Sequence, residues 1–413
     1  MKLVMLAVVG LIVVGGLRAG AQETAPEAAV QGVDPLRLGE VKFDPAIPAA
    51  LEVKQVIGSM LLVRPKVNGH EAGWFIFDTG AGVCVISKPH IERLGLERAG
   101  SIGAVGVGGN EQTPIYRAES VVLGPMRMAD HPMIATDLSF LKQHLKEEIV
   151  GVIGFGVLSR SVAEMDLENR TIALHDPAEY VLARGAWGPL NVENRTATVH
   201  AKFDGGEGDF GLDTGANGYV TFHEPITREK KLLEGRETTP AKLGGVGGYV
   251  EAKAATIAWF ELGGVRVEDI QANFAIEPKG SFANAAKAGN IGTAMLKPFV
   301  LVLDYANERI ALVRRDGAAG VAGAERIERL LRALEQSDAV FIRNGSEYSG
   351  KEAAEHLRMK LERAGGRVTT AAAFIEQLAS RSSLSGKPYQ VRTKDGKIVE
   401  AKEWFESRLR ELR

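Results

Sequence analysis

The apolar positions in the first three quarters of the chain form short runs and alternations, not long helical stripes. Residues 59–67 and 74–77 are two such runs, and Asn68-Gly69 lies between them. This dipeptide favours a tight turn between antiparallel strands, because both residues accept a positive φ. Residues 162–167 and 171–174 form a second pair of runs around Glu168-Asn169. The pattern predicts short strands joined by hairpins.

The same pattern continues further along the chain. Asp204-Gly205 is a second hairpin signal, and residues 300–304 and 310–313 are apolar runs around Ala306-Asn307. Only residues 89–94 and 226–233 are patterned as helices. We therefore expect the region up to about residue 318 to be mainly β.

From about residue 318 the spacing of the apolar residues changes to that of amphipathic helices. Ile327, Leu330, Leu331 and Leu334 form a stripe at helical spacing. Further signals are a capping box of Ser349 and Glu352 for a helix ending near Gly365, a helix over 371–379 opened by Thr370, a hairpin turn at Asp395-Gly396, and a terminal helix striped by Trp404, Phe405, Leu409 and Leu412. We expect residues 319–413 to form a small, mainly α accessory domain.

The N-terminus has the pattern of a signal peptide over residues 1–21. Lys2 precedes an apolar stretch of 15 residues, 3–17, which is shorter than the about 18 that a membrane span needs. Ala19-Gly20-Ala21 then offers a cleavage site. We expect export to the periplasm or beyond the cell and no membrane span after cleavage, an uncleaved anchor being the alternative. The proline-containing residues 22–45 are predicted to be a linker or arm, with a removable pro-segment as the second interpretation.

The central part of the chain is duplicated. Residues 75–81 (FIFDTGA) recur as 210–216 (FGLDTGA), with Asp78 and Asp213 separated by 135 positions. Four further landmarks recur in the same order at offsets of 138 or 139: Gly106 to Gly109 as Gly245 to Gly248, Leu123-Gly124 as Leu262-Gly263, Gly151 to Gly154 as Gly289 to Gly292, and Met165 to Arg170 as Leu303 to Glu308. Five landmarks in a common order indicate two copies of one unit. We expect two β lobes, residues 46–183 and 184–318.

Composition excludes several classes of function. With 50 basic and 52 acidic residues and a net charge of −2, the chain has no electrostatic field for nucleic acid. Its single cysteine, Cys84, excludes a disulfide framework or a thiolate zinc cluster and is predicted to be a small core residue. The eight histidines show no metal-ligand spacing, and the glycine-rich residues 244–248 lack a following Gly-Lys-Ser/Thr. We expect no metal and no cofactor.

Each copy places an aspartate on a tight turn after an apolar strand, followed by Thr and Gly. A two-fold axis between the copies would bring the carboxylates of Asp78 and Asp213 together. Carboxylates about 3 Å apart share one proton. The ionised one can act as general base on a water, while the protonated one donates to the carbonyl of a scissile amide.

These paired Asp-Thr-Gly-Ala turns, each followed by an Ile-Gly pair, resemble those of the aspartic proteases, and specifically the retropepsin-like branch of bacterial exported proteins. The resemblance covers roughly residues 50–315 and implies a bilobal acid-protease fold of two β-barrel lobes within one chain. It implies that Asp78 and Asp213 are the catalytic dyad, that Ile153-Gly154 and Ile291-Gly292 run beneath the two turns, and that no dimer is needed, so we expect a monomer.

The resemblance also implies roles for the neighbouring residues. Thr79 and Thr214 would brace the two turns against each other, and Gly80 and Gly215 would hold the carboxylates coplanar. Mobile flaps over the substrate would lie at residues 103–109 and 244–248. The flap candidates are Gly106, Gly108, Gly109, Gly245, Gly247 and Gly248.

Two features depart from the family pattern. Ala81 and Ala216 stand where members with acidic optima carry Ser or Thr, whose hydroxyl donates to the carboxylate. Loss of that donor raises the pKa values of the dyad, so we expect an optimum of roughly pH 5–6.5. In addition, Gly211 replaces the bulk of Ile76, and Asn217 stands where the first copy has Gly82. These differences predict a looser second lobe or a differently shaped turn.

Residues 342–348, 350–357 and 380–389 resemble a family of small bacterial secreted proteins without an established function. Two interpretations remain open: turns and caps around a helical core, or a recognition surface for a partner in the cell envelope with Arg343, His356 and Arg381 as exposed candidates. For the whole chain we expect an exported aspartic endopeptidase that acts on peptides or proteins. The alternatives are a peptide-binding module that has lost turnover and acts through residues 319–413, and lobes that merely target that region.

Overall fold

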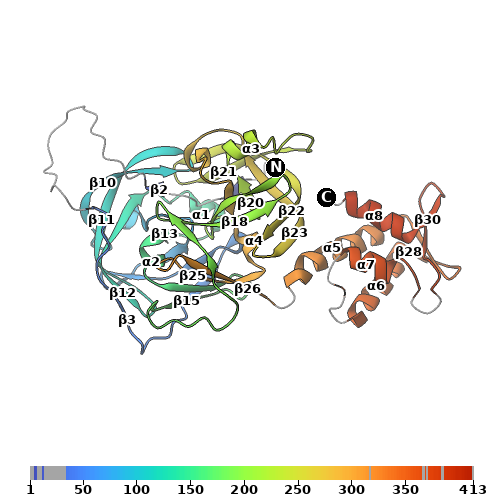
Figure 1. Cartoon of the computed structure of the whole chain (residues 1–413), viewed down its shortest axis with the longest axis horizontal. Coiled ribbons are helices and arrows are strands. Elements are labelled where there is room, and N and C mark those ends of the chain that lie inside the picture. The colour runs from blue at the N-terminus through green and yellow to red at the C-terminus, as the bar shows by residue number, and fades with distance from the viewer. Residues whose placement is uncertain are drawn as a thin grey trace. The chain divides into compact units, whose positions relative to one another are not determined.

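The computed structural model describes residues 4–6, 12–13, 34–315, 318–364, 368, 371–382 and 386–411. Most of the predicted signal peptide and the arm up to residue 33 lie outside the described residues, as do Thr370 and Leu412. The chain divides into two units, Met1–Arg314 and Arg315–Arg413. Figure 1 shows the β-rich first unit in blue to orange and the second in orange to red.

The first lobe is a curled sheet of twelve strands (Figure 1). Its order along the main path is β2-β10-β11-β12-β9-β13-β8-β5-β4. The strands are β2 (Ile12–Val13), β3 (Val41–Phe43), β4 (Val53–Gln55), β5 (Leu61–Val63), β6 (Lys66–Val67), β7 (His70–Glu71), β8 (Trp74–Phe77), β9 (Val85–Ser87), β10 (Glu97–Gly106), β11 (Gly109–Leu123), β12 (Met126–Thr136) and β13 (Ile149–Ile153). Asn68 and Gly69 take φ values of 49° and 78° between β6 and β7, so the predicted turn is confirmed.

The second lobe repeats this arrangement in a sheet of nine strands, ordered β1-β21-β22-β23-β20-β24-β19-β18-β17. The strands are β1 (Val4–Leu6), β17 (Asn191–Glu193), β18 (Thr196–Phe203), β19 (Gly206–Leu212), β20 (Val220–Phe222), β21 (Thr239–Gly245), β22 (Gly248–Leu262), β23 (Val265–Ala275) and β24 (Gly289–Ile291). The turn at Asp204-Gly205 joins β18 to β19 as predicted. One face of this sheet is packed with phenylalanines, with Phe210 ring centroids 5.8 Å from Phe203 and 5.1 Å from Phe260.

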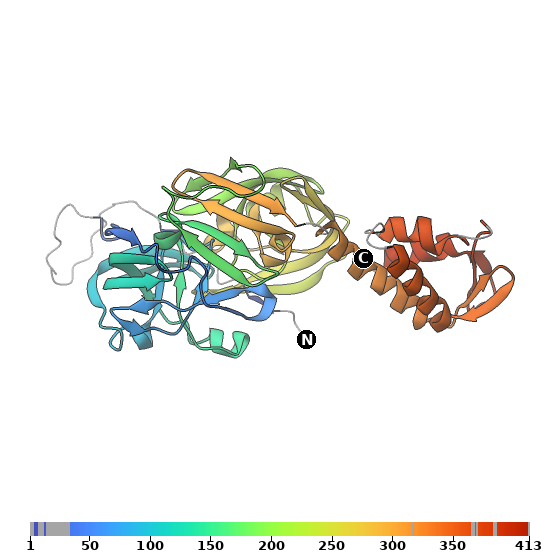
Figure 2. The ribbon, with the colours of Figure 1, turned by 90° about the horizontal axis from the view of Figure 1, so that it is seen from below.

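A third sheet joins the two copies. Its order is β15-β14-β25-β26-β16, from β14 (Val162–Asp166), β15 (Thr171–His175), β16 (Gly188–Pro189), β25 (Phe299–Asp304) and β26 (Arg309–Arg314). Equivalent strands pair reciprocally: Val162 faces Asp304, and Asp166 faces Val300. Self-complementary pairing of this kind is what a two-fold axis produces. Figure 2, seen from below, shows the two curled sheets side by side.

The expectation of only two helices in the β region is wrong. Residues 88–90 form a 3-10 turn and α3 (Glu224–Glu229) lies in the second predicted segment, but three short α-helices that were not predicted also occur. They are α1 (Leu141–Leu145), α2 (Phe155–Leu158) and α4 (Thr293–Leu296). Each is about one turn long, which is too short for an apolar period to show in the sequence.

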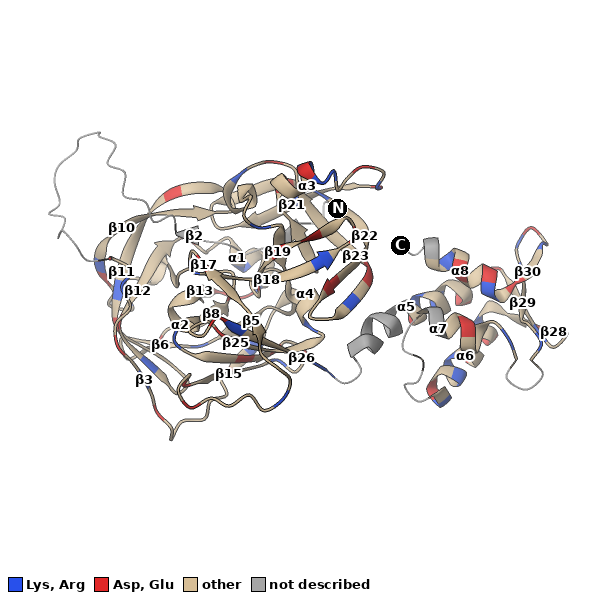
Figure 3. Cartoon of the chain, viewed as in Figure 1, with Lys and Arg blue, Asp and Glu red and all other residues tan. Residues whose placement is uncertain are grey.

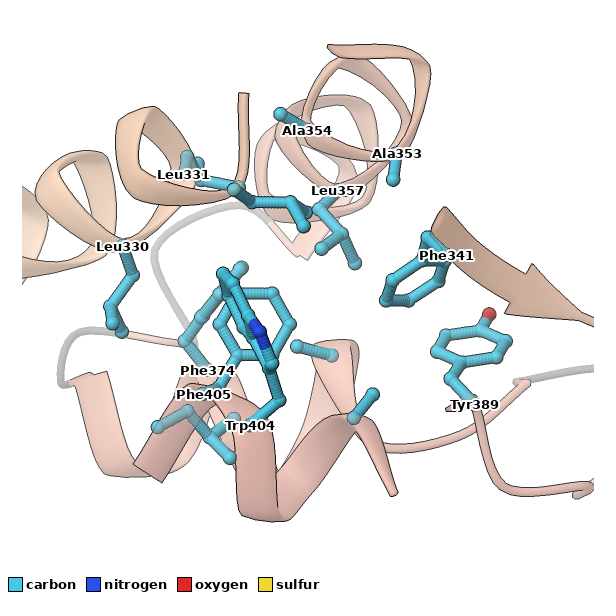
Figure 4. Close-up of a cluster of buried hydrophobic side chains, with 14 of the residues drawn as sticks. Leu330, Leu331, Phe341, Ala353, Ala354, Leu357, Phe374, Tyr389, Trp404 and Phe405 are labelled. Carbon is cyan, nitrogen blue, oxygen red and sulfur yellow. The ribbon is translucent and has the colours of Figure 1, made fainter. Parts of the chain in front are cut away.

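The C-terminal unit packs helices around one apolar core (Figure 4). Its elements are α5 (Ala318–Glu335), β27 (Val340–Arg343), β28 (Ser346–Ser349), α6 (Gly350–Ala364), α7 (Ala371–Phe374) with a π-helical turn at Ile375–Ala379, β29 (Gln390–Arg392), β30 (Ile398–Glu400) and α8 (Ala401–Glu411). The predicted stripe of α5 is buried, and Figure 4 shows Phe374, Trp404 and Phe405 packed together beneath it. Among the helices that the structure describes, none is long and apolar enough to cross a membrane.

Two local predictions for this unit have clear outcomes. The capping box is confirmed, because the Glu352 carboxylate accepts from the Ser349 backbone N–H at 2.9 Å and the Glu352 N–H donates to Ser349 Oγ at 3.3 Å. The interpretation of residues 342–348 as turns and caps is wrong, because they lie in the β27–β28 hairpin of a four-stranded sheet, β28-β27-β29-β30. The strands are three or four residues long, which is too short for an alternation to reveal them.

Candidate active site

The two Asp-Thr-Gly turns occupy equivalent places at the ends of β8 and β19. The Asp78 N–H donates to the Ile153 carbonyl at 2.9 Å, and the Asp213 N–H donates to the Ile291 carbonyl at 3.0 Å. Strand β13 runs parallel beside β8, and β24 runs parallel beside β19. The Ile-Gly segments therefore run alongside the turns and fix the position at which each strand ends.

The threonines after the aspartates tie the two turns together. Thr79 Oγ1 donates to the Leu212 carbonyl at 2.9 Å and accepts from the Thr214 N–H at 3.1 Å. Thr214 Oγ1 reciprocally donates to the Phe77 carbonyl at 2.7 Å and accepts from the Thr79 N–H at 3.1 Å. Both threonines are buried, so these four bonds hold the two lobes in one register at the site.

The glycines of the turns allow the carboxylates to approach the opposite backbone. A methyl group at Gly80 would lie 3.1 Å from Asp213 Cγ, and one at Gly215 would collide with the Asp78 carboxylate. Any larger residue would push the two carboxyl groups apart. The Gly80 N–H also donates to Asp78 Oδ1 at 2.8 Å.

The glycine-rich segments form two hairpins whose tips touch. Gly106 pairs with Gly109 at the end of β10–β11, and Gly245 pairs with Gly248 at the end of β21–β22. The Gly108 N–H donates to the Val246 carbonyl at 3.2 Å, and a methyl group at Gly108 would collide with the Gly247 carbonyl. The six flap candidates thus lie in or directly beside two reverse turns that meet each other.

Comparison with known families agrees with this geometry. Residues 63–157 and 199–293 each match the model of a family described as aspartyl protease, one match in each lobe. The two lobes belong to the aspartyl protease family. Residues 322–413 match a family of unknown function, DUF5329. The chain is also 48% identical over 65 residues to a protein of Salmonella typhimurium described as uncharacterized protein YfeK. That stretch is 16% of this chain, which spans about half (54%) of the length of that relative.

Burial dominates the electrostatics of the two aspartates. Asp78 and Asp213 are at most 1% exposed. Loss of solvent raises the pKa of Asp78 to about 7, although the N–H groups of Gly80, Gly215 and Ala81 oppose this shift. Burial and the neighbouring Asp78 charge raise the pKa of Asp213 well above its usual value. The pair therefore retains a proton at pH values where an exposed carboxyl group is ionised.

Two residues near the dyad were not identified from the sequence. Tyr305, directly after β25, donates its hydroxyl to the Thr79 carbonyl at 3.1 Å and is buried. Lys287, just before β24, places Nζ 2.6 Å from Thr196 Oγ1, and its charge lowers the pKa of Asp213. The first copy has Leu167 and Ile149 at these positions. A comparison of the two copies, position by position, for sites where one copy has an apolar residue and the other a polar one could have identified both residues.

The remaining candidates from the sequence are Cys84 and three residues of the C-terminal unit. In the C-terminal unit, Arg343 Nη1 lies 2.6 Å from His356 Nε2, whereas Arg381 is exposed and bridges to Pro388. Figure 3 shows both signs of charge interspersed along α6 and α8. Cys84 is buried in the first lobe, as expected for a core residue. Among the described residues, no three His, Cys, Asp or Glu side chains are grouped as metal ligands.

Proposed function

We propose that this chain is an exported aspartic endopeptidase with Asp78 and Asp213 as its catalytic dyad. The observation that carries the proposal is the reciprocal bonding of Thr79 and Thr214, which sets two buried carboxylates against each other across the lobes. A protein that only binds peptides gains nothing from two carboxyl groups held together in a buried site, where loss of solvent raises the pKa of both.

In this mechanism the dyad holds one proton between its carboxyl groups. The ionised carboxylate removes a proton from a water, which attacks the carbonyl carbon of the peptide bond. The protonated carboxyl group donates to the carbonyl oxygen as the tetrahedral intermediate forms. Proton transfer to the leaving nitrogen then breaks the C–N bond. Because the two groups titrate as a unit, the roles are assigned to the dyad and not to one residue.

The substrate would lie extended beneath the flaps and pair with their edge strands. The chain itself supports this interpretation, since β2 pairs antiparallel with β10 and β1 pairs parallel with β21. Both flap edges therefore accept an added strand. The signal peptide predicted at residues 1–21 supports an activity in the periplasm or outside the cell.

Cleavage of an unstructured protein tests the proposal. The mature chain beginning at Gln22 is incubated with casein from pH 3 to 8, beside Asp78→Asn, Asp213→Asn and a control, Asp209→Asn. Asp209 is a half-exposed carboxylate on β19 that pairs with His200 at 2.9 Å. We expect both dyad variants and a statine-type inhibitor to abolish cleavage, and the control to retain it. Folded protein that cleaves nothing at any pH would overturn the proposal and favour a peptide-binding module.

A further inference from the structure

The two lobes differ in the chemistry of one equivalent surface. On β8 and β19, Ile76 and Gly211 each lie two residues before the dyad aspartate, so they share its face of the sheet. The strand pairings around them are equivalent: Ile76 faces Leu62 and Val152, while Gly211 faces Thr198 and Asn290. This register gives seven equivalent pairs. They are Met60 and Thr196, Leu62 and Thr198, Ile76 and Gly211, Val85 and Thr221, Ile134 and Asn273, Ile149 and Lys287, and Val152 and Asn290.

Every member of the first set is apolar and every member of the second is polar or glycine. All seven residues of the first lobe belong to one hydrophobic cluster, which α1 covers through Leu141 and Leu145. In the second lobe the threonines and asparagines of the set are also buried, at no more than 9% exposure. Buried polar side chains that lack hydrogen-bond partners reduce stability. Proteins keep such side chains mainly at functional sites. Seven replacements of an apolar residue by a polar one or by glycine on one face indicate that this face of the second lobe has a function.

Lys287 is the one cation of this polar surface. The space left by Gly211 is filled by Asn290 and Lys287, since a methyl group there would lie 2.8 Å from Asn290 Oδ1 and 3.8 Å from Lys287 Nζ. The second lobe is therefore not loosened at Gly211. Burial lowers the pKa of Lys287 to about 8, while the charges of Asp213 and Glu193 raise it. Within the described part of the chain, the ammonium group bonds to Thr196 and forms no ion pair.

We infer that this polar surface is a substrate subsite that receives a carboxylate, with Lys287 as its cation and Thr196 and Asn290 as neighbouring hydrogen-bonding groups. The inference rests on the proposed function, because it names the substrates of that same site. An extended peptide that passes Asp78 and Asp213 has one side chain next to the second lobe. A partly buried ammonium that forms no ion pair, although the charges of Asp213 and Glu193 act on it, favours an acidic group at that position. The carboxylate comes from an Asp or Glu side chain or from the end of the peptide.

The test measures cleavage of peptides that differ only in charge. A peptide cut by the enzyme is amidated at its C-terminus, and Glu and Gln are compared at each position flanking the cleaved bond. We expect one position on one side of that bond to favour Glu by roughly tenfold or more in kcat/KM. Lys287→Met should reduce this ratio to about one, and Lys287→Arg should retain most of it. Lys202→Met, an exposed lysine on β18, is the control and should leave the ratio unchanged.

A second arm separates the two sources of the carboxylate. Peptides truncated after each position are compared with a free and an amidated C-terminus. A preference for the free terminus that disappears in Lys287→Met also supports the subsite and assigns its occupant to a chain end. A Glu preference that persists in Lys287→Met, or no preference for a carboxylate in either arm, overturns the inference.

Binding distinguishes this failure from failure of the proposed function. Reduced-amide versions of the Glu and Gln peptides cannot be hydrolysed, and their affinities are measured by fluorescence anisotropy. Glu-dependent binding that is lost in Lys287→Met supports the subsite even if casein is never cleaved. Cleavage that requires both aspartates but shows no discrimination between Glu and Gln supports the protease and overturns the subsite.

Discussion

Val107 and Val246, at the tips of the two flaps, each pack into the hydrophobic cluster of the opposite lobe. Val107 of the first flap is buried among residues of the second lobe, including Leu243 and Phe282. Val246 of the second flap belongs reciprocally to the hydrophobic cluster of the first lobe, with Ile76 and Val152. Each flap is thus closed by apolar contacts with the opposite lobe. Opening for a substrate requires both valines to leave these contacts.

Gly108→Ala should hold the flaps apart. The added methyl group collides with the Gly247 carbonyl, so the tips cannot meet as they do here. We expect faster hydrogen exchange at the backbone amides of both tips, together with a several-fold change in KM. Gly103→Ala on the same flap is the control, because its methyl group would meet only Gln112 Nε2, at 3.8 Å. Unchanged exchange in Gly108→Ala would show that the tips do not rest against each other in solution.

Thr79→Val should destabilise the first unit and abolish activity. The substitution leaves the Leu212 carbonyl and the Thr214 N–H without their partner in a buried site. We expect a loss of about 2–4 kcal/mol in the free energy of unfolding. Thr79→Ser keeps the oxygen and should retain most of both stability and activity. Equal losses in the Val and Ser variants, measured by urea unfolding, would contradict the role assigned to the hydroxyl group.

The contribution of Asp78 to the stability of the first unit should fall as the pH rises from about 4 to about 7. The folded-state pKa of Asp78, about 7, lies above its usual value of 3.8, so the folded chain binds more protons in this window. The stabilisation that Asp78 contributes therefore decreases as its proton is released, whereas the lowered pKa values of the buried His131 and His223 act in the opposite direction in this window. Asp78→Asn cannot ionise and should melt a few degrees higher than the native protein at pH 8, with a smaller difference at pH 4. In Asp209→Asn the native pH dependence should remain.

Ala81→Ser and Ala216→Ser should move the activity profile toward acid. A hydroxyl group that donates to the ionised carboxylate favours the charged form and lowers the pKa values of the dyad. We expect the acidic limb of kcat/KM to shift down by roughly half to one pH unit. Ala72→Ser, buried in the same lobe, controls for a new hydroxyl group. Cleavage by the native protein that still becomes faster as the pH falls below about 3 would contradict the mildly acidic optimum expected from the two alanines.

The sequence was sufficient to predict the duplicated lobes and the approach of Asp78 and Asp213. The reason is physical: two copies of one turn that pack around an axis must bring equivalent residues together, and the spacing of the landmarks reports the copies directly. The Ser349–Glu352 cap was also predictable, because both partners lie within one helical turn.

Features that depend on contacts between distant segments were not predictable in this way. The bond of Tyr305 to Thr79 spans 226 positions, and that of Lys287 to Thr196 spans 91. No local pattern marks either residue. The short helices at residues 155–158 and 293–296 begin where an Ile-Gly segment leaves the Asp-Thr-Gly turn, so tertiary contacts decide them rather than helical periodicity.

Tyr305→Phe should lower kcat several-fold with little change in KM. The Tyr305 hydroxyl, which comes from the second copy, positions the Thr79 carbonyl one residue after Asp78. Its loss leaves a buried carbonyl without this donor, at a cost of about 1 kcal/mol in stability. Tyr180→Phe is the matched control, since it removes a 3.2 Å bond to Glu164 elsewhere in the same unit. Because that bond lies away from the turns, kcat should stay unchanged in the control. A purely structural role for Tyr305 predicts equal kcat values in the two variants once the folded fraction is matched.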